Sequence, residues 1–346
     1  MVHNNSEVDG VTEQDFGDDV PEARPSVDVV ICAYTEDRWT LLGRAVASLQ
    51  SQTTPPRRII VCIDHNDGLL RRARAEWEAE PGQPPVTVLP NELPGRLGSA
   101  RNTALLGAKA DVVAFLDDDA RAEPNWLERL LACYSDDGVQ AVGGAPLPEF
   151  ETHRPRWFPP EFDWVFGCHH GGLPTTRGTV RHLIGANMSA RTAALRSIGG
   201  FHSDNHDDMD LSHRVAERFG TSSVVYEPRA VVWHFVPRSR VTWSYFWQRC
   251  FRVNRGKVAA YRDMGEAANL AAEIDFVRRV SRSTLQDFAA LARGDAAGPA
   301  RAGAILCGLA LAAAGNLMGR LDLLRGVPPQ ELTTGLPSDA GVFGAA

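Results

Sequence analysis

Short apolar runs alternate with amphipathic segments along the first third of the chain. Four apolar runs have the length of buried strands, at residues 27–33, 58–63, 86–89 and 112–116. Between them, apolar side chains recur with helical spacing at residues 40–50, 69–80 and 98–110. This alternation predicts an α/β fold, with a mostly parallel sheet and helices on both of its faces.

Polar side chains come directly after three of the predicted strands. Tyr34 follows the first strand, Asp64 follows the second, and the aspartates 117–119 follow the fourth. The carboxyl ends of parallel strands meet at one edge of a sheet, and open α/β sheets bind their ligands there. We therefore expect these side chains to converge on one ligand site.

The regular pattern loosens after about residue 120. Residues 146–180 are rich in Pro, Gly, Trp and Phe and contain few clear elements. Two short apolar runs, 224–226 and 230–233, predict short strands, and the chain is predicted to be helical from Thr242 onward. An irregular segment such as 146–180 is typical of a chain that wraps a site or forms a substrate wall.

Two C-terminal segments have compositions that suit a membrane surface. Residues 302–319 carry no charged side chain, but this length is near the lower limit for a spanning helix, and Asn316 lies inside. Residues 241–257 mix aromatic side chains with arginines, as at headgroup depth, although an amphipathic packing helix has the same pattern. We expect a cytoplasmic protein that attaches to the cytoplasmic membrane face without spanning it, with ordinary core packing as the alternative.

The excess negative charge of the chain lies at its N-terminus. The formal net charge is −7, and residues 1–22 hold seven of the 43 acidic residues without any Lys or Arg. The remaining 36 acids match the 36 basic residues, and a neutral body excludes nucleic acid as the expected partner. The tail, residues 1–25, lacks hydrophobic periodicity and is expected to be disordered. The six scattered cysteines form no CxxC pair and indicate free thiols in a reducing compartment.

Asp117, Asp118 and Asp119 are the strongest candidates for chemistry. Two carboxylates at positions i and i+2, just past a buried strand, can hold a divalent cation against a diphosphate. Mn²⁺ and Mg²⁺ prefer oxygen ligands and often bind through carboxylates together with substrate phosphates. An acidic turn in solvent would have the same sequence, but the position at the end of an apolar strand favours a metal site.

Four segments, taken in order, resemble a known family. They are 29–36 (Val-Val-Ile-Cys-Ala-Tyr-Thr-Glu), 61–64 (Val-Cys-Ile-Asp), 98–102 (Gly-Ser-Ala-Arg-Asn) and 115–119 (Phe-Leu-Asp-Asp-Asp). Their order and spacing, over about residues 27–240, resemble family 2 glycosyltransferases. The resemblance implies a GT-A fold, a nucleoside-diphosphate-sugar donor, a divalent metal and inversion at the anomeric carbon. The domains implied are a catalytic domain at 26–240, made of a nucleotide-binding half (26–120) and an acceptor half (121–240), and a helical segment at 241–346.

The resemblance gives the nucleotide side of the site individual roles. Tyr34 and Glu36, next to Ala33, lie where the family encloses the base of the donor. Asp64 lies where a carboxylate accepts a hydrogen bond from the uracil ring, and Arg101 matches the basic residue that approaches the nucleotide. A strand-end cap would explain Asp64 equally simply, and an exposed helix residue would explain Arg101.

The resemblance also assigns the metal ligands. Asp117 matches the first Asp of the DxD motif, near the ribose and the metal, and Asp118 lies beside it on the donor side. Asp119 matches the second Asp, the direct metal ligand. His234 follows a predicted strand, where related enzymes carry a third metal ligand, and a neutral imidazole suits that role. A packed core histidine is the alternative for His234.

A second acidic motif, at residues 206–214, resembles the family's Glu-Asp-x-Asp-Leu sequence. Asp207 stands in the place of the Glu, and Asp208 stands in the place of the catalytic base. Inversion requires a carboxylate that takes the proton of the acceptor hydroxyl during attack on the sugar carbon. Asp210 is the second candidate for the base, and an acidic helix start is the alternative for the whole motif.

The acceptor side is identified by weaker similarities. Gly185 and Asn187 lie in the segment that lines the sugar and acceptor pocket in the family. An ordinary turn without a functional role is the alternative for this segment. The stretch 157–168, which includes Trp164, resembles transferases that extend lipid-linked sugars, including glucuronosyltransferases that act on polyprenyl-phosphate glycans. We expect a hydroxyl acceptor that is either a lipid-linked glycan or a small-molecule scaffold. Residues 248–251 lack the Gln-x-x-Arg-Trp signature of processive synthases, which favours transfer of a single sugar.

Two other classes of protein share parts of this pattern. A nucleotidyltransferase also combines an α/β sheet with carboxylate-held Mg²⁺, but it usually has a glycine-rich basic loop after the first strand. Here residues 33–36, Ala-Tyr-Thr-Glu, follow that strand. A non-catalytic sugar-binding module could keep the fold, but the presence of Asp117, Asp119 and Asp208 argues against that class.

Overall fold

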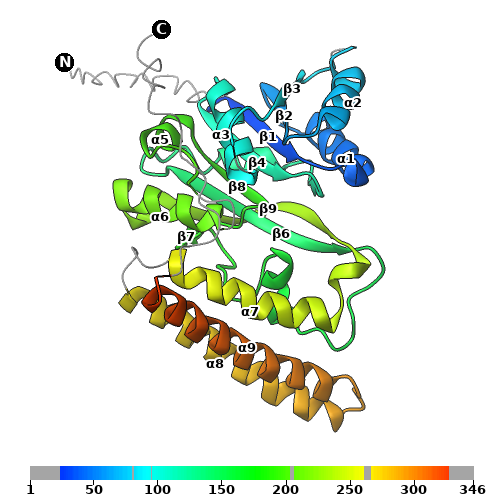
Figure 1. The fold of residues 1–346 in the computed structure, drawn as a ribbon, viewed down its shortest axis with the longest axis vertical. Coiled ribbons are helices and arrows are strands. Elements are labelled where there is room, and N and C mark those ends of the chain that lie inside the picture. The colour runs from blue at the N-terminus through cyan, green and yellow to red at the C-terminus, as the bar shows by residue number, and fades with distance from the viewer. Residues whose placement is uncertain (1–23, 80–81, 95, 203–205, 261–265, 327–346) are drawn as a thin grey trace, which may run out of the picture.

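The computed structural model describes residues 24–79, 82–94, 96–202, 206–260 and 266–326, with the backbone alone for 259–260 and 266–275. The predicted disordered tail, residues 1–25, lies almost wholly outside these ranges. The described chain forms a mixed sheet with helices on both faces and a separate layer of long helices below it (Figure 1).

The central sheet has two halves. Four strands form a parallel half in the order β3 (Val86–Pro90), β2 (Arg58–Ile63), β1 (Val27–Ala33) and β4 (Val112–Asp117). The order continues with β8 (Asn187–Arg191), β6 (Ala141–Phe150), β9 (Val224–Val236) and β5 (Ala120–Ala122), while β7 (Gly178–Thr179) pairs with β9. In this second half β8 is antiparallel to β4 and β6, and β5 is antiparallel to β9. The α/β fold class is confirmed, and the mixed half comes from the region where the sequence pattern loosens.

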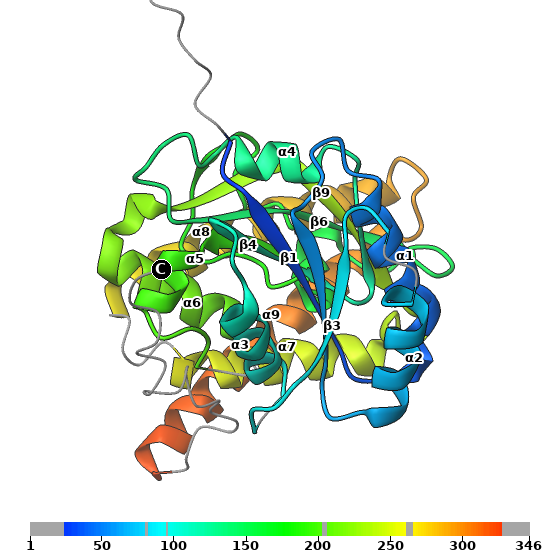
Figure 2. The ribbon, with the colours of Figure 1, turned by 90° about the horizontal axis from the view of Figure 1, so that it is seen from above.

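Alternate residues of the inner strands bury against helices on opposite faces. Val29 of β1 packs with one group of helices and Val30 with the other, because successive strand side chains point to opposite sides. One face carries α1 (Trp39–Gln50), α2 (Asp67–Trp77) and α4 (Trp126–Leu131). The other face carries α3 (Leu97–Gly107), α5 (Thr192–Ser197) and α6 (Asp207–Phe219). Figure 2 shows these helices on either side of β1 and β4.

β9 replaces the two short strands expected at 224–226 and 230–233. It runs without interruption for 13 residues, and its pairing with β6 shifts register between Gly144 and Ala145. Glu227 and Arg229 lie at this irregularity and bond to each other through their side chains. These polar residues interrupt the apolar pattern in the sequence, and the structure accommodates them in a bulge. The long strand brings His234 to the carboxyl end of β4.

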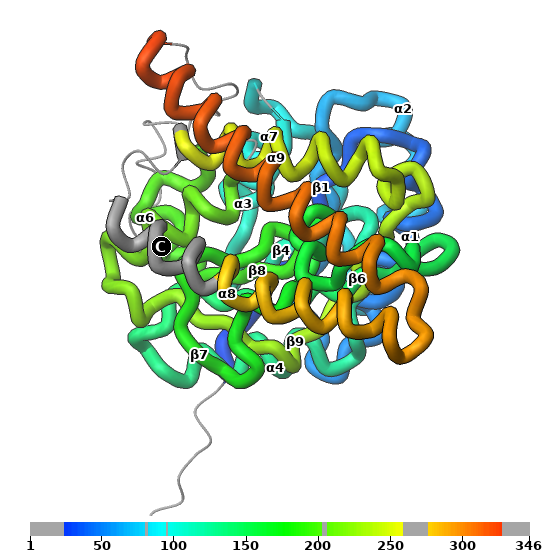
Figure 3. Tube along the Cα trace, turned by 90° about the horizontal axis from the view of Figure 1, so that it is seen from below, coloured from blue at the N-terminus to red at the C-terminus, as the bar shows by residue number. Residues whose placement is uncertain are grey.

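The C-terminal helices form a layer of their own, α7 (Trp243–Ala260), α8 (Glu266–Leu291) and α9 (Gly298–Leu324), as Figure 3 shows from below. α7 packs on η2 (Pro160–Phe166), a 3-10 helix in the segment after β6. Phe246 of α7 is fully buried there, and Trp243 stacks on Trp157 with ring centroids 4.0 Å apart. The aromatic side chains of 241–257 therefore serve core packing, although Trp243 and Trp247 stay nearly half exposed.

Candidate functional site

The site lies at the carboxyl ends of β1, β2 and β4. Tyr34 and Asp64 come immediately after β1 and β2, and Asp117 is the last residue of β4. The Asp64 N–H donates to the Ala33 carbonyl at 2.8 Å, so the two strand ends are tied together where they leave the sheet. The predicted convergence on one edge is what the structure shows.

Three side chains there form a group that fits a metal ion. Ligand atoms of Asp117, Asp119 and His234 all lie within 4.8 Å of one another. His234 Nε2 is 3.0 Å from Asp119 Oδ1 and 3.8 Å from Asp117 Oδ2. The position of His234 follows from strand pairing, because it lies opposite Ala120 in the antiparallel pair of β5 and β9.

Hydrogen bonding fixes the charges of this group. Burial alone would lower the pKa of His234, but hydrogen bonds with Asp119 and Cys168 raise it well above the usual value. Burial would raise the pKa of Asp119, but the hydrogen bond with His234 and the positive charges of Arg38 and Arg240 lower it to about 2. Without a cation, these pKa directions favour a carboxylate beside a protonated imidazole, and a cation bound by His234 Nε2 would displace that proton.

Arginines that the sequence analysis did not place here neutralise the aspartates. Arg38 Nη1 lies 2.7 Å from Asp118 Oδ1 and 3.2 Å from Asp119 Oδ2, and Arg240 Nη1 lies 3.9 Å from Asp119 Oδ2. Arg38 ends η1 (Glu36–Arg38), which begins two residues after Tyr34, and Arg240 ends η4 (Arg238–Arg240), which begins two residues after β9. Position after a strand end is the signal that marks both arginines as candidates.

Asp118 supports the fit of a cation at this edge. Its side chain is 4% exposed, burial raises its pKa to about 7, and its Oδ2 atom is buried without a hydrogen-bond partner in the protein. An orphaned buried carboxylate oxygen is costly unless a ligand group satisfies it. The two carboxylates of Asp117 and Asp119 and the imidazole of His234 form a donor set that suits Mn²⁺ and other divalent transition metals.

The nucleotide side is more open. The Asn91 side chain donates to Asp64 Oδ1 at 2.7 Å, and the Asp64 carboxylate stays partly exposed. Tyr34 is 57% exposed, and Glu36 lies 3.5 Å from Arg72 on α2. An exposed ring beside an oriented carboxylate is an arrangement that can enclose a nucleotide base and accept a hydrogen bond from it.

Arg101 links the donor side to the second acidic motif. Its side chain is buried and bonds to Asp207, to Asp117 Oδ1 at 3.3 Å and to the Gly185 carbonyl at 3.0 Å. The structure therefore places this side chain beneath the site as a bridge between β4, α6 and the segment before β8. The Gly185 N–H in turn donates to Asp208 Oδ2 at 3.0 Å.

The three aspartates at the start of α6 have different environments. Asp207 is buried, and burial raises its pKa to about 7 against the opposing charge of Arg101. Asp208 is half-buried, and backbone N–H groups of Gly185 and Met209 donate to its two oxygens at 3.0 and 2.8 Å. Asp210 accepts from the His202 N–H at 3.3 Å. Asp208 is thus the aspartate whose carboxylate is oriented by two donors beside Gly185.

Two residues of the predicted acceptor pocket have structural partners. Asn187 is fully buried, its Oδ1 accepts from the Trp126 indole at 2.8 Å, and its Nδ2 donates to the Ala230 carbonyl at 2.9 Å. These bonds occupy both ends of the amide and join β8 to α4 and β9. Trp164 is half-buried in η2, with the Lys257 ammonium 5.7 Å from its ring. The six cysteines are all free thiols, as predicted.

Comparison with known proteins agrees with this geometry. The model of glycosyl transferase family 2 matches residues 28–199. The glucosyl-dolichyl phosphate glucuronosyltransferase of Haloferax volcanii is 31% identical over 239 residues, covering 64% of this chain and 74% of that protein. The succinoglycan biosynthesis protein ExoM of Rhizobium meliloti is 28% identical over 264 residues, covering 73% of this chain and 82% of that protein.

The fold also has counterparts among solved structures. A mannosyltransferase from Pyrobaculum calidifontis, solved with GDP-Man and Mn²⁺, superposes with a TM-score of 0.57 at 19% sequence identity. The match covers 85% of this chain and 87% of that one. At this level of identity the likeness establishes a shared GT-A fold.

Proposed function

Because the chain belongs to glycosyl transferase family 2, we propose that it moves one sugar from a UDP-linked donor to an acceptor hydroxyl, with inversion at the anomeric carbon. Membership makes the protein a glycosyltransferase that uses a nucleotide-sugar donor. The observation that supports the proposed transfer is the pair of contacts made by Arg101. This one side chain bonds both to Asp117, at the proposed donor site, and to Asp207, in the motif that contains the proposed base.

A divalent cation is the cofactor, and Asp117, Asp119 and His234 would hold it. When bound, Mn²⁺ or Mg²⁺ neutralises the negative charge that develops on the departing diphosphate. The ligand atoms come from β4, the segment after it and β9, so the site is complete only in the folded chain. Arg38 and Arg240, which now face the same carboxylates, are placed to face the diphosphate as well.

Asp208 is our candidate for the general base. An inverting transfer needs a carboxylate on the acceptor side to take the hydroxyl proton as the oxygen attacks the sugar carbon. Two backbone N–H groups orient the Asp208 carboxylate, so its direction toward a substrate does not depend on a flexible side chain. Asp207 would position Asp208 and not take the proton itself, because its carboxylate bonds to Arg101 and accepts from the backbone N–H of Asp208.

Asp64 is our candidate for reading the base. Its Oδ1 is occupied by Asn91, which leaves Oδ2 for the ring N–H of uracil. A guanine ring presents a different donor and acceptor edge, so uridine nucleotides should bind better. A thymidine nucleotide presents the same edge as uracil, and the binding comparison must therefore include one.

The acceptor we favour is a lipid-linked sugar. This chain is similar over most of its length to a transferase named for a dolichyl-phosphate-linked acceptor, and the stretch 157–168 resembles such enzymes. A small-molecule scaffold stays the alternative. The exposed surface of the C-terminal helices fits the lipid acceptor, because a bilayer would then lie beside the acceptor half.

We further propose that the protein is cytoplasmic and that α8 and α9 contact the membrane face peripherally. α9 is long and apolar enough to cross a membrane, with mean hydropathy 1.7, by length and composition. One side of it packs on the protein, where Gly308 and Gly315 approach Phe162 and the backbone of Phe251. A helix that buries one side and exposes leucines on the other suits an interface better than a span.

The test is product release with a panel of nucleotide sugars, Mn²⁺, and either a short-chain lipid-phosphate sugar or a soluble glycoside. Release of UDP together with a glycosylated product of inverted configuration supports the proposal. Formation of a nucleoside triphosphate and a sugar phosphate when pyrophosphate is added would identify a nucleotidyltransferase, and donor binding without any release would identify a sugar-binding module. Retention of configuration would overturn the inverting mechanism alone.

A further inference from the structure

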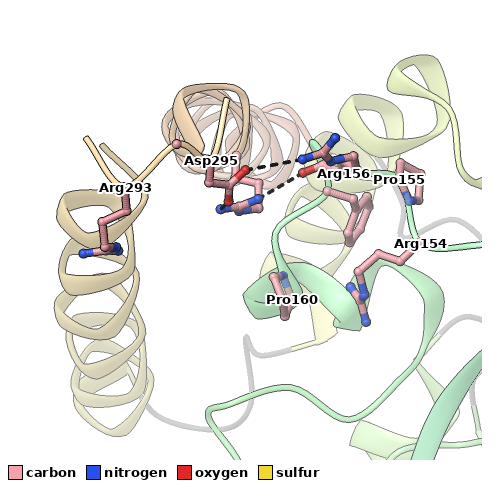
Figure 4. A pocket seen from close by; sticks show the side chains of 9 residues that line it. Arg154, Pro155, Arg156, Pro160, Arg293 and Asp295 are labelled. Carbon is pink, nitrogen blue, oxygen red and sulfur yellow. Dashed lines mark hydrogen bonds and ion pairs between the residues drawn. The ribbon is translucent and has the colours of Figure 1, made fainter. Parts of the chain in front are cut away.

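A cavity of about 570 Å³ lies between the segment after β6 and the turn that joins α8 to α9. None of the residues that line it belongs to the site at the carboxyl ends of β1, β2 and β4. Arg154, Arg156, Arg293 and Arg301 line it together with Asp295. Figure 4 shows Arg293 on the helical side and Arg156 on the opposite side, with Asp295 between them. The N-terminus of α9, which follows Asp295, adds a partial positive charge to the same wall.

Two of the four arginines are already neutralised. Arg154 bonds to both oxygens of Asp163 at 2.6 and 2.7 Å, and Arg301 bonds to Asp287 at 2.7 Å. Asp295 pairs with Arg156 and with Arg301, the latter at 2.7 Å, while Arg293 donates to the Gln286 carbonyl at 3.4 Å. Arg156 is 3.8 Å from Asp295 with its side chain 80% exposed, so its guanidinium is available for a further anion.

The end of α8 beside this cavity exposes apolar and basic side chains. On the last turns of α8, Leu285, Phe288 and Leu291 are half exposed or more. Their spacing of three residues puts them on one side of the helix, which ends at Leu291, two residues before Arg293. Among residues 276–297, the two acids, Asp287 and Asp295, are partly buried in ion pairs. A soluble surface normally mixes both signs of charge, whereas leucine, phenylalanine and arginine together match an anionic membrane interface.

We propose that this cavity binds the phosphate of an anionic lipid headgroup while Leu285, Phe288 and Leu291 lie in the adjoining acyl region. The inference rests on the proposed membrane contact and is independent of the proposed sugar transfer. Guanidinium groups bind phosphate with paired hydrogen bonds, and both Arg156 and Arg293 line the cavity. The apolar side chains beside the opening commit the site to a phosphate that belongs to a bilayer, because a free phosphate gains nothing from them.

The test compares two double variants of the full chain in flotation with vesicles. Arg156→Gln/Arg293→Gln removes two charges from the cavity, and Arg282→Gln/Arg325→Gln removes two exposed charges from the same helical layer outside it. Vesicles contain phosphatidylcholine alone or with a third of phosphatidylglycerol. We expect the wild type to prefer the anionic vesicles at least tenfold, the cavity variant to lose at least tenfold of that affinity, and the control variant to lose less than about threefold.

Equal losses in the two variants would overturn the inference, because general electrostatics would then explain binding. If the wild-type protein does not float with anionic vesicles, both the proposed membrane contact and this inference are wrong. Inorganic phosphate alone is the third arm: a thermal shift with phosphate that the cavity variant lacks, without vesicle binding, would reassign the cavity to a soluble anion. Sugar transfer to a soluble acceptor, measured in parallel, fails only if the proposed function fails.

Discussion

His234 Nε2 lies 3.0 Å from Asp119 Oδ1, although the two residues are 115 positions apart in the sequence. The contact exists because β5 and β9 pair antiparallel, with Ala120 opposite His234. A short strand directly after the aspartates therefore sets the third ligand of the proposed metal site. The contact also makes the metal site sensitive to the register of a single strand pair.

Asp119→Ala should abolish metal-dependent donor binding without unfolding the protein. The substitution removes the carboxylate that both His234 and Arg38 contact, which is the direct metal ligand in our proposal. Titration calorimetry of UDP with Mn²⁺ measures the effect, and His234→Ala should weaken the same binding at least tenfold. Glu217→Ala, on the exposed side of α6, is the control and should bind normally. Unchanged affinity in the Asp119 variant would remove that residue from the metal site.

Asp208→Asn should remove turnover while donor binding stays nearly intact. The amide keeps the shape of the side chain but cannot take a proton, and loss of a general base costs about 10²–10⁴-fold. Because a base acts in the transition state, kcat and kcat/KM should fall together. Asp207→Asn should cost less and Asp210→Asn least. If Asp208→Asn turns over normally while one of the other two is inactive in single-turnover experiments, the base must be reassigned to the inactive position.

UDP should bind better than GDP, and Asp64→Ala should erase most of that preference. Loss of a hydrogen bond to a charged group costs about 1.5–3 kcal/mol, which is roughly ten- to a hundredfold in UDP affinity. GDP affinity should change little. Asp67→Ala, an exposed acid three residues along the chain, is the matched control. A competition experiment in which wild-type protein binds GDP as tightly as UDP would refute this assignment.

Asp207 should make stability fall as pH rises from about 4 to 7. Burial raises its folded pKa to about 7, so in this window the folded state holds a proton that the unfolded state has released. Asp207→Asn removes this dependence, so the variant should gain stability relative to wild type up to about pH 7 and then level off. Urea unfolding at pH 5, 6, 7 and 8 measures the difference, with Glu217→Gln as the control. A difference that is flat with pH would show that the ion pair with Arg101 offsets burial.

Gly315→Ala should destabilise the protein, and Gly303→Ala should not. A Cβ at Gly315 would lie 2.3 Å from the Phe251 carbonyl oxygen, where α9 crosses α7, whereas a Cβ at Gly303 meets nothing within 4 Å. Overpacking typically costs about 1–3 kcal/mol, while Gly to Ala at an exposed helix position gains up to about 1 kcal/mol. Thermal unfolding of both variants decides it. Equal melting temperatures would mean that α9 packs more loosely than the structure shows.

This packing also changes how membrane attachment should be tested. Deletion of all residues after Arg293 would remove α9 and expose the side of α7 that it covers, including the buried side chain of Phe246. Such a truncated chain would change in stability as well as in membrane affinity. Substitution of exposed side chains leaves the core intact and is the cleaner test.

The nucleotide half could be predicted closely from the sequence. The predicted strands 27–33 and 58–63 have the bounds of β1 and β2, because strands buried on both faces are continuous apolar runs. The mixed half could not, since β6 contains two glycines and two prolines and its partners lie far along the chain. Local periodicity carries no information on such pairings.

The same division holds within the site. The aspartates are predicted from the sequence because a motif fixes their spacing, and Asp64 is predicted because it follows a strand. Arg38 and Arg240 were missed because their partners are set by tertiary folding, and Arg240 lies beside a stretch that matched a membrane interface equally well. Asn187 was assigned to the pocket by position, and only packing shows that Trp126 and Ala230 already occupy its amide.

The arginines around the acidic centre mean that donor binding is an exchange of counter-ions. Asp117, Asp118 and Asp119 each already contact a guanidinium, from Arg101, Arg38 or Arg240. The resting site therefore projects little net field into solvent, and an arriving cation competes with charges that are already in place. The cation arrives with the donor diphosphate. The guanidinium groups that it displaces from the carboxylates can therefore pair with that diphosphate instead. Metal and nucleotide should accordingly bind as one unit, each weakly in the absence of the other.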